Sequence, residues 1–421
     1  MIRAPKTIKE VLASRQCSGC GACAAAAPPL IEMAETVDEN RRPVLPKSLK
    51  VELEIMVNKA CPEIATHNTA SDSTIADAAW GPVLEVWQGH AKDEEIRFKG
   101  SSGGATTALA LFALEQGGFH GALHIKARQD APEKNLASIS TDREGLLTGC
   151  GSRYAPSSVC DQLPLVEAAP GKCVVIGKPC DIRGAVAAAT AIGDPLQSKI
   201  GLTLAIFCAG VPSHEGTKSL LASLGSGAEQ KLQSLQYRGE GWPGDMVATW
   251  KGNNGLQSQQ RVSYKKGWGD ILQKYRQWRC HICEDHTGES ADIAIGDPWQ
   301  TPLSDDEKGS SLIVVRTARG RAFLRKAVAA GYIQADKKDP PVLFEAQPNL
   351  FETKGAVWGR KLALRLMLQK TSAMTADSFK CWLALPAYKK GQSVFGTFKR
   401  ILQRRLYGAK KTKWLLRDGA Q

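Results

Sequence analysis

The chain has 421 residues, of which 43% are hydrophobic and 23% charged, and this ordinary globular composition is long enough for two or three domains. No apolar run reaches the roughly 18 residues that a membrane span needs, and the N-terminal MIRAPKTIKEVLASRQ lacks the hydrophobic block of a secretory signal. Twelve cysteines without an export signal predict a reducing, cytoplasmic compartment, in which thiols serve as ligands rather than as disulfides.

The composition divides the chain into three parts. Residues 1–75 carry three closely spaced cysteines and are expected to form a small, loop-rich iron–sulfur domain of ferredoxin type with short helices. A polar stretch from Thr66 is typical of a linker. Residues 76–340 are expected to form an α/β domain, and residues 341–421 a basic helical region.

The middle part predicts an α/β fold with a mostly parallel sheet. Its apolar runs are bounded by Gly, Pro or Asp, and they are CVVIG (173–177), GLTLAIF (201–207), ADIAIG (291–296) and SLIVVRT (311–317). Helical segments lie between several of them, such as the one from Asp181, and an earlier apolar helix is expected from about Ala105 to Glu115. This alternation is typical of parallel strands joined by helices.

A cysteine triplet near the N-terminus carries the strongest chemical signal. The stretch CSGCGAC places cysteines at i, i+3 and i+6, namely Cys17, Cys20 and Cys23. A complete ferredoxin run would have a fourth cysteine at position 27, where this chain has Ala27. Gly19 and Gly21 allow the backbone to curl closely around a cubane cluster. Structural zinc sites usually use two separated cysteine pairs, so we favour a 4Fe–4S cluster over zinc or inert thiols.

The fourth ligand has a candidate in KACPEI, because Cys61 precedes Pro62 just as the last cysteine of a ferredoxin run precedes proline. The 37 residues between Cys23 and Cys61 are enough for an excursion that returns to the cluster. The alternative is that Cys61 is a small buried apolar residue.

A second set of cysteines is scattered along the α/β part and consists of Cys180, Cys208, Cys280 and Cys283. The first two follow apolar runs, and the carboxyl ends of parallel strands converge on one edge of a sheet. The last two form a C-x₂-C loop just before another strand. Four thiolates here are suited to a second 4Fe–4S cluster, with four-cysteine zinc as the main competitor.

A protein with two such clusters usually also holds a flavin, which converts between one- and two-electron chemistry. Two glycine-containing stretches are candidates for binding it. FKGSSGGATTALA and GCGSRYAP contribute Ser101, Ser102, Gly103, Gly104, Thr106, Ser152, Arg153 and Tyr154. A helix N-terminus favours phosphate, although an ordinary helix cap is the competing interpretation.

The order of these motifs, with VIGKPCDIRGA, FCAGVPS and CHICEDHTGESADIAIGDPW, resembles the coenzyme F-420 hydrogenase/dehydrogenase beta-subunit family over about residues 15–300. The resemblance implies FAD, held by the SSGG helix start and the GSRY loop, and it strengthens the second cluster. The doubled serine is most similar to members encoded beside polysaccharide genes. Lys178 and Asp181 flank Cys180 where the family often has threonine and glutamine, and we count Lys178 among the cofactor-binding residues.

The basic C-terminal region has three interpretations. Residues 351–421 contain 16 Lys and Arg against three acids, and this difference of +13 equals the formal net charge of the whole chain. From Val394 the apolar positions 395, 398, 401, 402 and 406 fit one helical face. The helix is expected to dock on its own domain, to lie peripherally on an anionic membrane, or to bind an acidic ferredoxin. Nucleic-acid binding is not expected, because no recognised module accompanies the charge.

These signals predict an oxidoreductase that uses two 4Fe–4S clusters and FAD. Electrons are expected to enter from reduced ferredoxin or a reduced deazaflavin, and a hydride to leave for an unknown organic substrate. The alternatives are a non-catalytic electron-relay subunit of a hydrogenase or dehydrogenase, and a zinc-stabilised binding protein. No catalytic acid or base is identified, since the lone His214 is more typical of a structural histidine.

Overall fold

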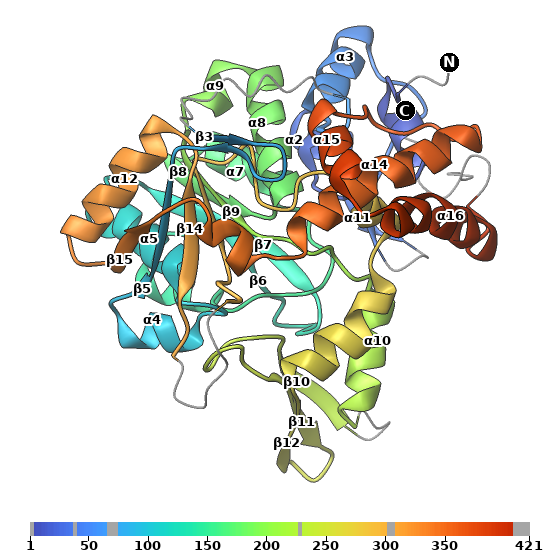
Figure 1. Ribbon diagram of the computed structural model, residues 1–421. Coiled ribbons are helices and arrows are strands. Elements are labelled where there is room, and N and C mark those ends of the chain that lie inside the picture. The colour runs from blue at the N-terminus through green and yellow to red at the C-terminus, as the bar shows by residue number, and fades with distance from the viewer. Residues whose placement is uncertain (1–3, 37–39, 65–74, 226–229, 301–307, 407–421) are drawn as a thin grey trace.

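The computed structural model describes residues 4–36, 40–64, 75–225, 230–300 and 308–406. Its centre is an eight-stranded sheet (Figure 1). The spatial order is β15 (Ile333–Lys338), β5 (Glu85–Ala91), β14 (Ser311–Val315), β13 (Ile293–Gly296), β9 (Ile200–Ile206), β8 (Cys173–Gly177), β6 (Gly121–Ala127) and β7 (Asn135–Ser140). Within the described residues, no helix is long and apolar enough to cross a bilayer.

The four central strands β13, β9, β8 and β6 are parallel to one another. Antiparallel pairings add β7 at one edge and β14, β5 and β15 at the other. Five of the eight strands therefore point in one direction, since β5 reverses twice relative to β13. The predicted α/β fold is confirmed, with antiparallel strands as an addition at both edges.

Alternate residues of the central strands face two different helical layers. Val174, Leu202 and Ile293 face a core with α4 (Glu94–Lys99), α5 (Ala105–Glu115) and α12 (Ala318–Ala329). Val175 and Ala294 belong to a second core on the other face, with α7 (Leu163–Glu167) and α8 (Pro179–Ile192). The sheet is therefore covered on both faces, as near-continuous apolar strands require.

The predicted strand at 173–177 and the helix Ala105–Glu115 have the expected bounds. The other three strands differ by one or two residues at their ends. The helix expected from Asp181 begins at Pro179, because proline is well suited to the first turn of a helix. These small differences arise at element ends, where sequence patterns are least specific.

The N-terminal region contains the short helices α1 (Ile8–Ala13), α2 (Ala22–Ala25) and α3 (Val51–Ala60). It also contains a hairpin of β1 (Glu32–Glu35) and β2 (Arg41–Val44). Leu12, Ala24 and Val57 belong to the same buried core as α8 and the sheet. The region thus packs directly on the α/β part. Most of the expected linker, residues 66–74, lies outside the described residues.

A second sheet protrudes from the body at the bottom of Figure 1. It is antiparallel and consists of β10 (Gln230–Gln236), β11 (Met246–Gly252) and β12 (Gln257–Val262). It packs with α10 (His214–Ser223) and a π-helix, Lys265–Ile271. The remaining elements are β3 (Ile75–Asp77), β4 (Gly81–Val83), α6 (Arg143–Leu147), α9 (Asp194–Gln197), α11 (Trp278–His281), α13 (Val342–Ala346) and 3₁₀ turns at Val159–Gln162 and Leu272–Tyr275.

The C-terminal region forms α14 (Leu350–Leu366), α15 (Ala376–Ala384) and α16 (Ala387–Gln403), as the helical pattern predicts. The expected single apolar face is wrong in detail. Ile401 is fully buried against Ile282 and Leu364, whereas Phe395 and Leu402 are 72% and 59% exposed. Small polar residues, Ser393 and Thr397, complete the packed side, so the helix docks on its own chain through a different stripe. Residues 407–421 lie outside the described residues.

Candidate functional site: two sets of thiols and a cofactor-sized cavity

The second set of cysteines comes together at the carboxyl ends of the parallel strands. Cys180 lies in the first turn of α8, directly after β8, and Cys208 follows the adjacent strand β9. Cys280 lies in α11, and Cys283 follows it. Burial raises the pKa of Cys180 well above its usual range, the Lys178 ammonium opposes this, and the neighbouring Cys208 and Cys283 thiols raise it further. Burial and the Cys280 thiol raise the pKa of Cys208 to about 12.

Backbone amides point at two of these sulfur atoms. The N–H of Gly210 donates to Cys208 Sγ over 3.4 Å, and the N–H of Val211 donates to Cys280 Sγ over 3.3 Å. Hydrogen bonds of this kind stabilise a thiolate. Several thiolates in one buried place repel one another, so they are stable together only when a cationic group binds them.

The first set of cysteines surrounds a small cavity. Its lining includes all four of the predicted ligands, Cys17, Cys20, Cys23 and Cys61. Burial raises the pKa of Cys23 well above its usual range, and the three other thiols of the set raise it further. Cys23 and Cys61 therefore lie close together in space, because the β1–β2 hairpin and α3 between them bring the chain back to the triplet.

Two glycines shape this loop as the sequence predicts. Gly19 and Gly21 have φ of +76° and +91°, in the left-handed region that favours glycine. A Cβ at Gly21 would lie 2.6 Å from the backbone nitrogen of Asp161, so the loop also approaches a neighbouring segment too closely for a side chain.

Neither set has the arrangement of a single-ion site. In the part of the chain that the structure describes, no group of three or more Cys, His, Asp or Glu side chains would hold a metal ion directly. A cubane cluster is larger than one ion, and its four ligands stand at separate corners. The donor chemistry of both sets, four buried or half-buried thiols each, fits such a cluster.

A buried ion pair connects the two sets of thiols. Glu63, two residues after Cys61, accepts a hydrogen bond from Arg279, the residue before Cys280, and their side chains are only 3% and 5% exposed. Burial opposes ionisation of Glu63, but the charges of Arg279 and Arg183 hold its pKa below the usual range. The two thiol sets are thus neighbours across one charged contact, which sequence reasoning did not foresee.

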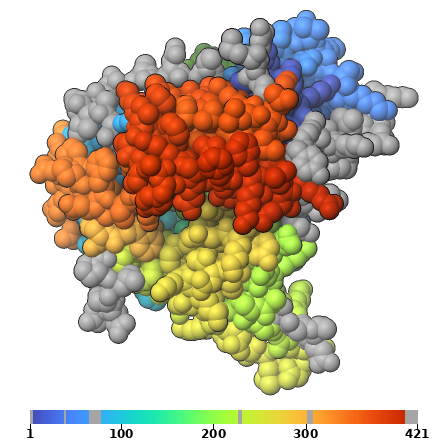
Figure 2. All heavy atoms as spheres, turned by 45° about the vertical axis from the view of Figure 1, so that its right-hand side comes forward, coloured from blue at the N-terminus to red at the C-terminus, as the bar shows by residue number. Residues whose placement is uncertain are grey.

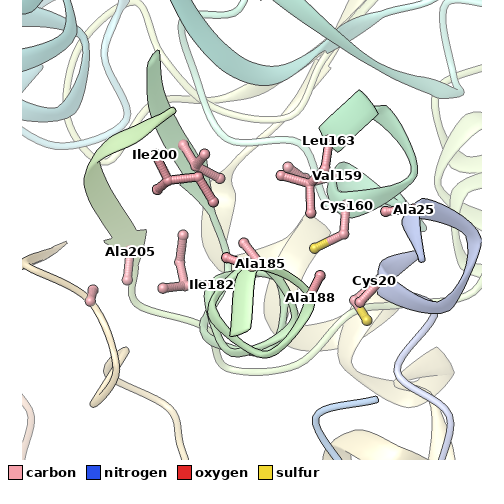
Figure 3. Close-up of a cluster of buried hydrophobic side chains, with 14 of the residues drawn as sticks. Cys20, Ala25, Val159, Cys160, Leu163, Ile182, Ala185, Ala188, Ile200 and Ala205 are labelled. Carbon is pink, nitrogen blue, oxygen red and sulfur yellow. The ribbon is translucent and has the colours of Figure 1, made fainter. Parts of the chain in front are cut away.

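Cys160 is a further buried thiol beside the first set. Figure 3 shows Cys20 and Cys160 close to α8, and a Cβ at Gly184 would lie 3.0 Å and 3.1 Å from their sulfur atoms. A hydrogen bond from Cys160 lowers the pKa of Cys20. The carbonyl oxygen of Asp181, 3.1 Å from Cys160 Sγ, is an alternative acceptor. Cys173 is fully buried in β8, where it contributes to packing.

A cavity of about 770 Å³ lies beside the second set of thiols. The volume is within the range of small-molecule and cofactor sites. Eight of the nine predicted cofactor residues line it: Ser101, Ser102, Gly104, Thr106, Ser152, Arg153, Tyr154 and Lys178. Gly103 is not among the lining residues, because its backbone packs against β5 and β14. Cys208 lines the same cavity, so the structure brings the two predicted flavin loops and a predicted metal ligand together.

The SSGG loop is held by specific contacts. Ser311 in β14 lies 2.9 Å from Ser102 Oγ and accepts a hydrogen bond from the Gly103 N–H. Ser101 Oγ accepts a hydrogen bond from the N–H of Ser152, which joins the two loops directly. Gly104 has φ of +72° and is the N-cap of α5, and the first turn of this helix lines the cavity, so a helix N-terminus with its unpaired N–H groups borders it.

Two of the predicted cofactor residues have structural partners. The Arg153 guanidinium donates to Asn135 and to the backbone carbonyls of Pro132, Lys134 and Leu235, so it holds its loop in place. The Lys178 ammonium lies 2.6 Å from the carboxylate of Asp181. Burial opposes the charge of Lys178, but Asp181 and Cys180 raise its pKa above the usual range.

Sequence reasoning missed one wall of the cavity, formed by Arg238, Tyr264, Trp268, Asp297 and Trp299. Arg238 donates two hydrogen bonds to Asp297, over 2.9 and 2.7 Å. Its guanidinium lies 4.7 Å from the Tyr264 ring, which stacks on Trp299 at 5.6 Å. The position of DPW directly after β13 was an available signal, because ligand sites form at such strand ends. The residues from the protruding sheet and the π-helix carry no comparable signal.

His124 in the cavity lining gives a testable dependence on pH. Burial lowers its pKa from the ordinary 6.5 to about 4, and its ring nitrogens contact Ser140 Oγ and the Ile125 carbonyl. The folded protein holds the His124 imidazole neutral, whereas the unfolded chain binds a proton at pH values below 6.5. The stability of the folded state is therefore unaffected by His124 above pH 6.5 and falls as the pH decreases from 6.5 towards 4. The shift corresponds to about 3 kcal/mol.

We therefore expect the thermal unfolding midpoint of the wild type to fall more steeply between pH 6.5 and 4.5 than that of His124→Gln, measured by anaerobic calorimetry. Parallel curves for the two proteins would show that His124 does not titrate in this way.

The fold and the site together define a class: an α/β protein with a cofactor-sized cavity at the carboxyl ends of parallel strands and two sets of four buried or half-buried thiols. Residues 86–164 match the N-terminal part, and residues 171–341 the C-terminal part, of the family described as "Coenzyme F420 hydrogenase/dehydrogenase, beta subunit". These matches cover more than half of the chain, and the protein belongs to this family.

Individual relatives have low sequence identity to this chain but match it over most of its length. The coenzyme F420 hydrogenase subunit beta of Methanosarcina barkeri is 29% identical over 269 residues, which cover 62% of this chain and 84% of that protein. An uncharacterized protein of Methanocaldococcus jannaschii is 25% identical over 84% of this chain and 98% of its own. A chain of the F420-reducing [NiFe] hydrogenase complex from M. barkeri has a TM-score of 0.51 at 21% identity, covering 81% of this chain and 100% of its own, which shows a similar fold.

Proposed function

We propose that this chain is an iron–sulfur flavoprotein that passes electrons between ferredoxin or a reduced deazaflavin coenzyme and an organic acceptor. The observation that carries the proposal is the cavity of about 770 Å³, because both predicted flavin loops and Cys208 line it. A cofactor bound there would border the second set of thiols. A cytoplasmic location belongs to the same proposal and rests on the use of cysteines as ligands.

The residues have separate roles in this proposal. Four thiols hold each of two 4Fe–4S clusters, the first between residues 17 and 61 and the second between residues 180 and 283. The N-terminus of α5 and the SSGG loop favour the phosphates of FAD. The aromatic wall with Arg238 would exclude water from a cofactor bound in the cavity. When bound, 4Fe–4S clusters exchange single electrons, and FAD couples them to two-electron chemistry.

Membership of the family supports a second candidate equally well, an electron-relay beta subunit without a substrate of its own. The relatives from M. barkeri and Methanococcus voltae are named as beta subunits of coenzyme F420 hydrogenases, and the F420-dependent formate dehydrogenase 1 subunit beta of Methanococcus maripaludis is 25% identical over 61% of this chain. In this case a partner subunit would complete the reaction.

Anaerobic purification with analysis of iron, acid-labile sulfide and flavin tests both candidates. We expect about eight irons and one FAD per chain, as two cubane clusters and one flavin require. Zinc without flavin would contradict both. Oxidation of the chemically reduced protein by a small organic acceptor, with no other subunit present, would favour the enzyme over the relay.

A further inference from the structure

Four arginines gather beside the second set of thiols, and one of them, Arg276, also lines the cavity described above. They come from three segments: Arg276 precedes α11, Arg360 lies in α14, and Arg400 and Arg404 lie at the end of α16. In Figure 2 the red C-terminal helices lie against the yellow chain of about residues 250–290. We call these four residues the arginine cluster.

The cluster lies directly on the C-x₂-C loop. Arg360 donates a hydrogen bond to the carbonyl oxygen of His281, between Cys280 and Cys283, over 2.8 Å. A Cβ at Gly210 would lie 2.8 Å from Arg276 Cδ and 3.1 Å from Cys280 Cβ, so this arginine adjoins the cysteine. Arg400 and Arg404 lie on either side of Ile401 in sequence, which packs on Ile282 of the same loop.

The charges of the cluster lack carboxylate partners among the described residues. None of the four arginines takes part in an ion pair there, although the same surroundings pair Arg279 with Glu63 and Lys361 with Glu284. Three donor atoms of the cluster are buried without a hydrogen-bond partner among the described residues: Arg276 Nε, Arg360 Nε and Arg400 Nη1. Burial, together with the charges of Arg400 and Arg276, lowers the pKa of Arg360 to about 10, so the guanidinium groups repel one another. The Cys280 and Cys208 thiols offset part of the charge of Arg276. The rest of the cluster is costly unless an anionic partner binds it.

We propose that the arginine cluster is the docking surface for a small acidic electron-carrier protein, which exchanges electrons at the second set of thiols. In each event the reduced carrier loses one electron and this site gains one, with no bond made or broken. The proposal rests on the proposed function, because it needs a redox group at that site. Complementary charge steers such encounters and accelerates them at low salt.

An anionic membrane is a less suitable partner for this cluster. The exposed apolar residues of α16 are Tyr388, Phe395 and Leu402, which are seven residues apart and form one stripe. Arg400 and Arg404 are each two residues from Leu402, so they are rotated by about 200° from that stripe. One flat membrane surface cannot contact both.

The test is the rate at which a reduced acidic ferredoxin reduces the purified holoprotein, followed anaerobically by stopped-flow absorbance. Arg404 is exposed, so Arg404→Glu is expected to fold normally. We expect its second-order rate to be at least about tenfold below wild type at low salt, and the wild-type rate to fall as salt is added. The matched control is Lys399→Glu, which makes the same charge change on an exposed residue of the same helix and is expected to change the rate less than about twofold.

Reduced methyl viologen, a small cation that needs no docking site, separates the possible failures. It is expected to reduce all three proteins at similar rates. If it reduces the wild type but the ferredoxin does not, or if both variants slow ferredoxin equally, the docking proposal is wrong while the proposed function stands. If Arg404→Glu weakens only sedimentation with anionic vesicles, the cluster serves a membrane instead. A protein without iron and flavin would contradict the proposed function itself.

Discussion

Replacement of Cys61 by Ala is expected to remove the first cluster and leave the second, so that iron and labile sulfide fall by about half, from about eight to about four irons per chain. The reason is geometric: Cys61 lines the same small cavity as the three cysteines of the N-terminal triplet, and its thiol raises the pKa of Cys23. Electron paramagnetic resonance of the reduced protein should then show one cluster signal instead of two interacting ones.

The matched control is Cys173→Ala, which removes another buried thiol from β8, outside both sets. This variant should keep all of its iron. Full iron in Cys61→Ala would show that Cys61 is not a ligand, unless Cys160 replaces it from its position beside Cys20. The double variant Cys61→Ala with Cys160→Ala decides between these outcomes, because it leaves only the triplet.

A second large effect is expected at the start of α5. A methyl group at Gly104 would lie 2.6 Å from the carbonyl oxygen of Ile96, and the residue has φ of +72°. Gly104→Ala therefore has to shift the SSGG loop, which lines the cavity. We expect the FAD content to fall at least about tenfold, because phosphate binding at a helix N-terminus depends on the position of its free N–H groups.

Gly118 provides an unusually close control for this change. It also has φ of +72°, but a Cβ there would meet no atom within 4 Å. Gly118→Ala should show only the backbone cost of a left-handed alanine, about 1–2 kcal/mol, and should keep its flavin. Flavin released by denaturation, measured per chain, gives the comparison. Equal flavin in the two variants would mean that the SSGG loop does not hold the cofactor.

Much of the fold was predictable because the signals are local. The apolar run at 173–177 and the helix from Ala105 to Glu115 have periodicities that depend only on neighbouring residues. The glycines of the cysteine triplet have the positive φ values that their spacing indicates. The α16 pattern was less informative, because an amphipathic sequence identifies two faces of a helix without showing which one packs.

The candidate site could be predicted only in part from sequence patterns, and the rest depends on tertiary contacts. Strand ends predicted that Cys180 and Cys208 lie close together, since parallel strands end at the same edge. The sequence could not place Arg153, whose guanidinium is occupied by backbone carbonyls from distant segments. It also carried no signal for the contact between Glu63 and Arg279, which are 216 residues apart.

The sequence by itself determined the chemistry of this protein: which thiols are available, how they are spaced, and which glycine loops precede helices. These properties are fixed by residue type and by short-range backbone preference. Only the tertiary structure decided that the two thiol sets are neighbours, that Cys208 lines the same cavity as both glycine loops, and that four arginines meet without a carboxylate among the described residues. Those arrangements depend on which strand ends and helices pack together, and long-range packing leaves no local pattern in a single sequence.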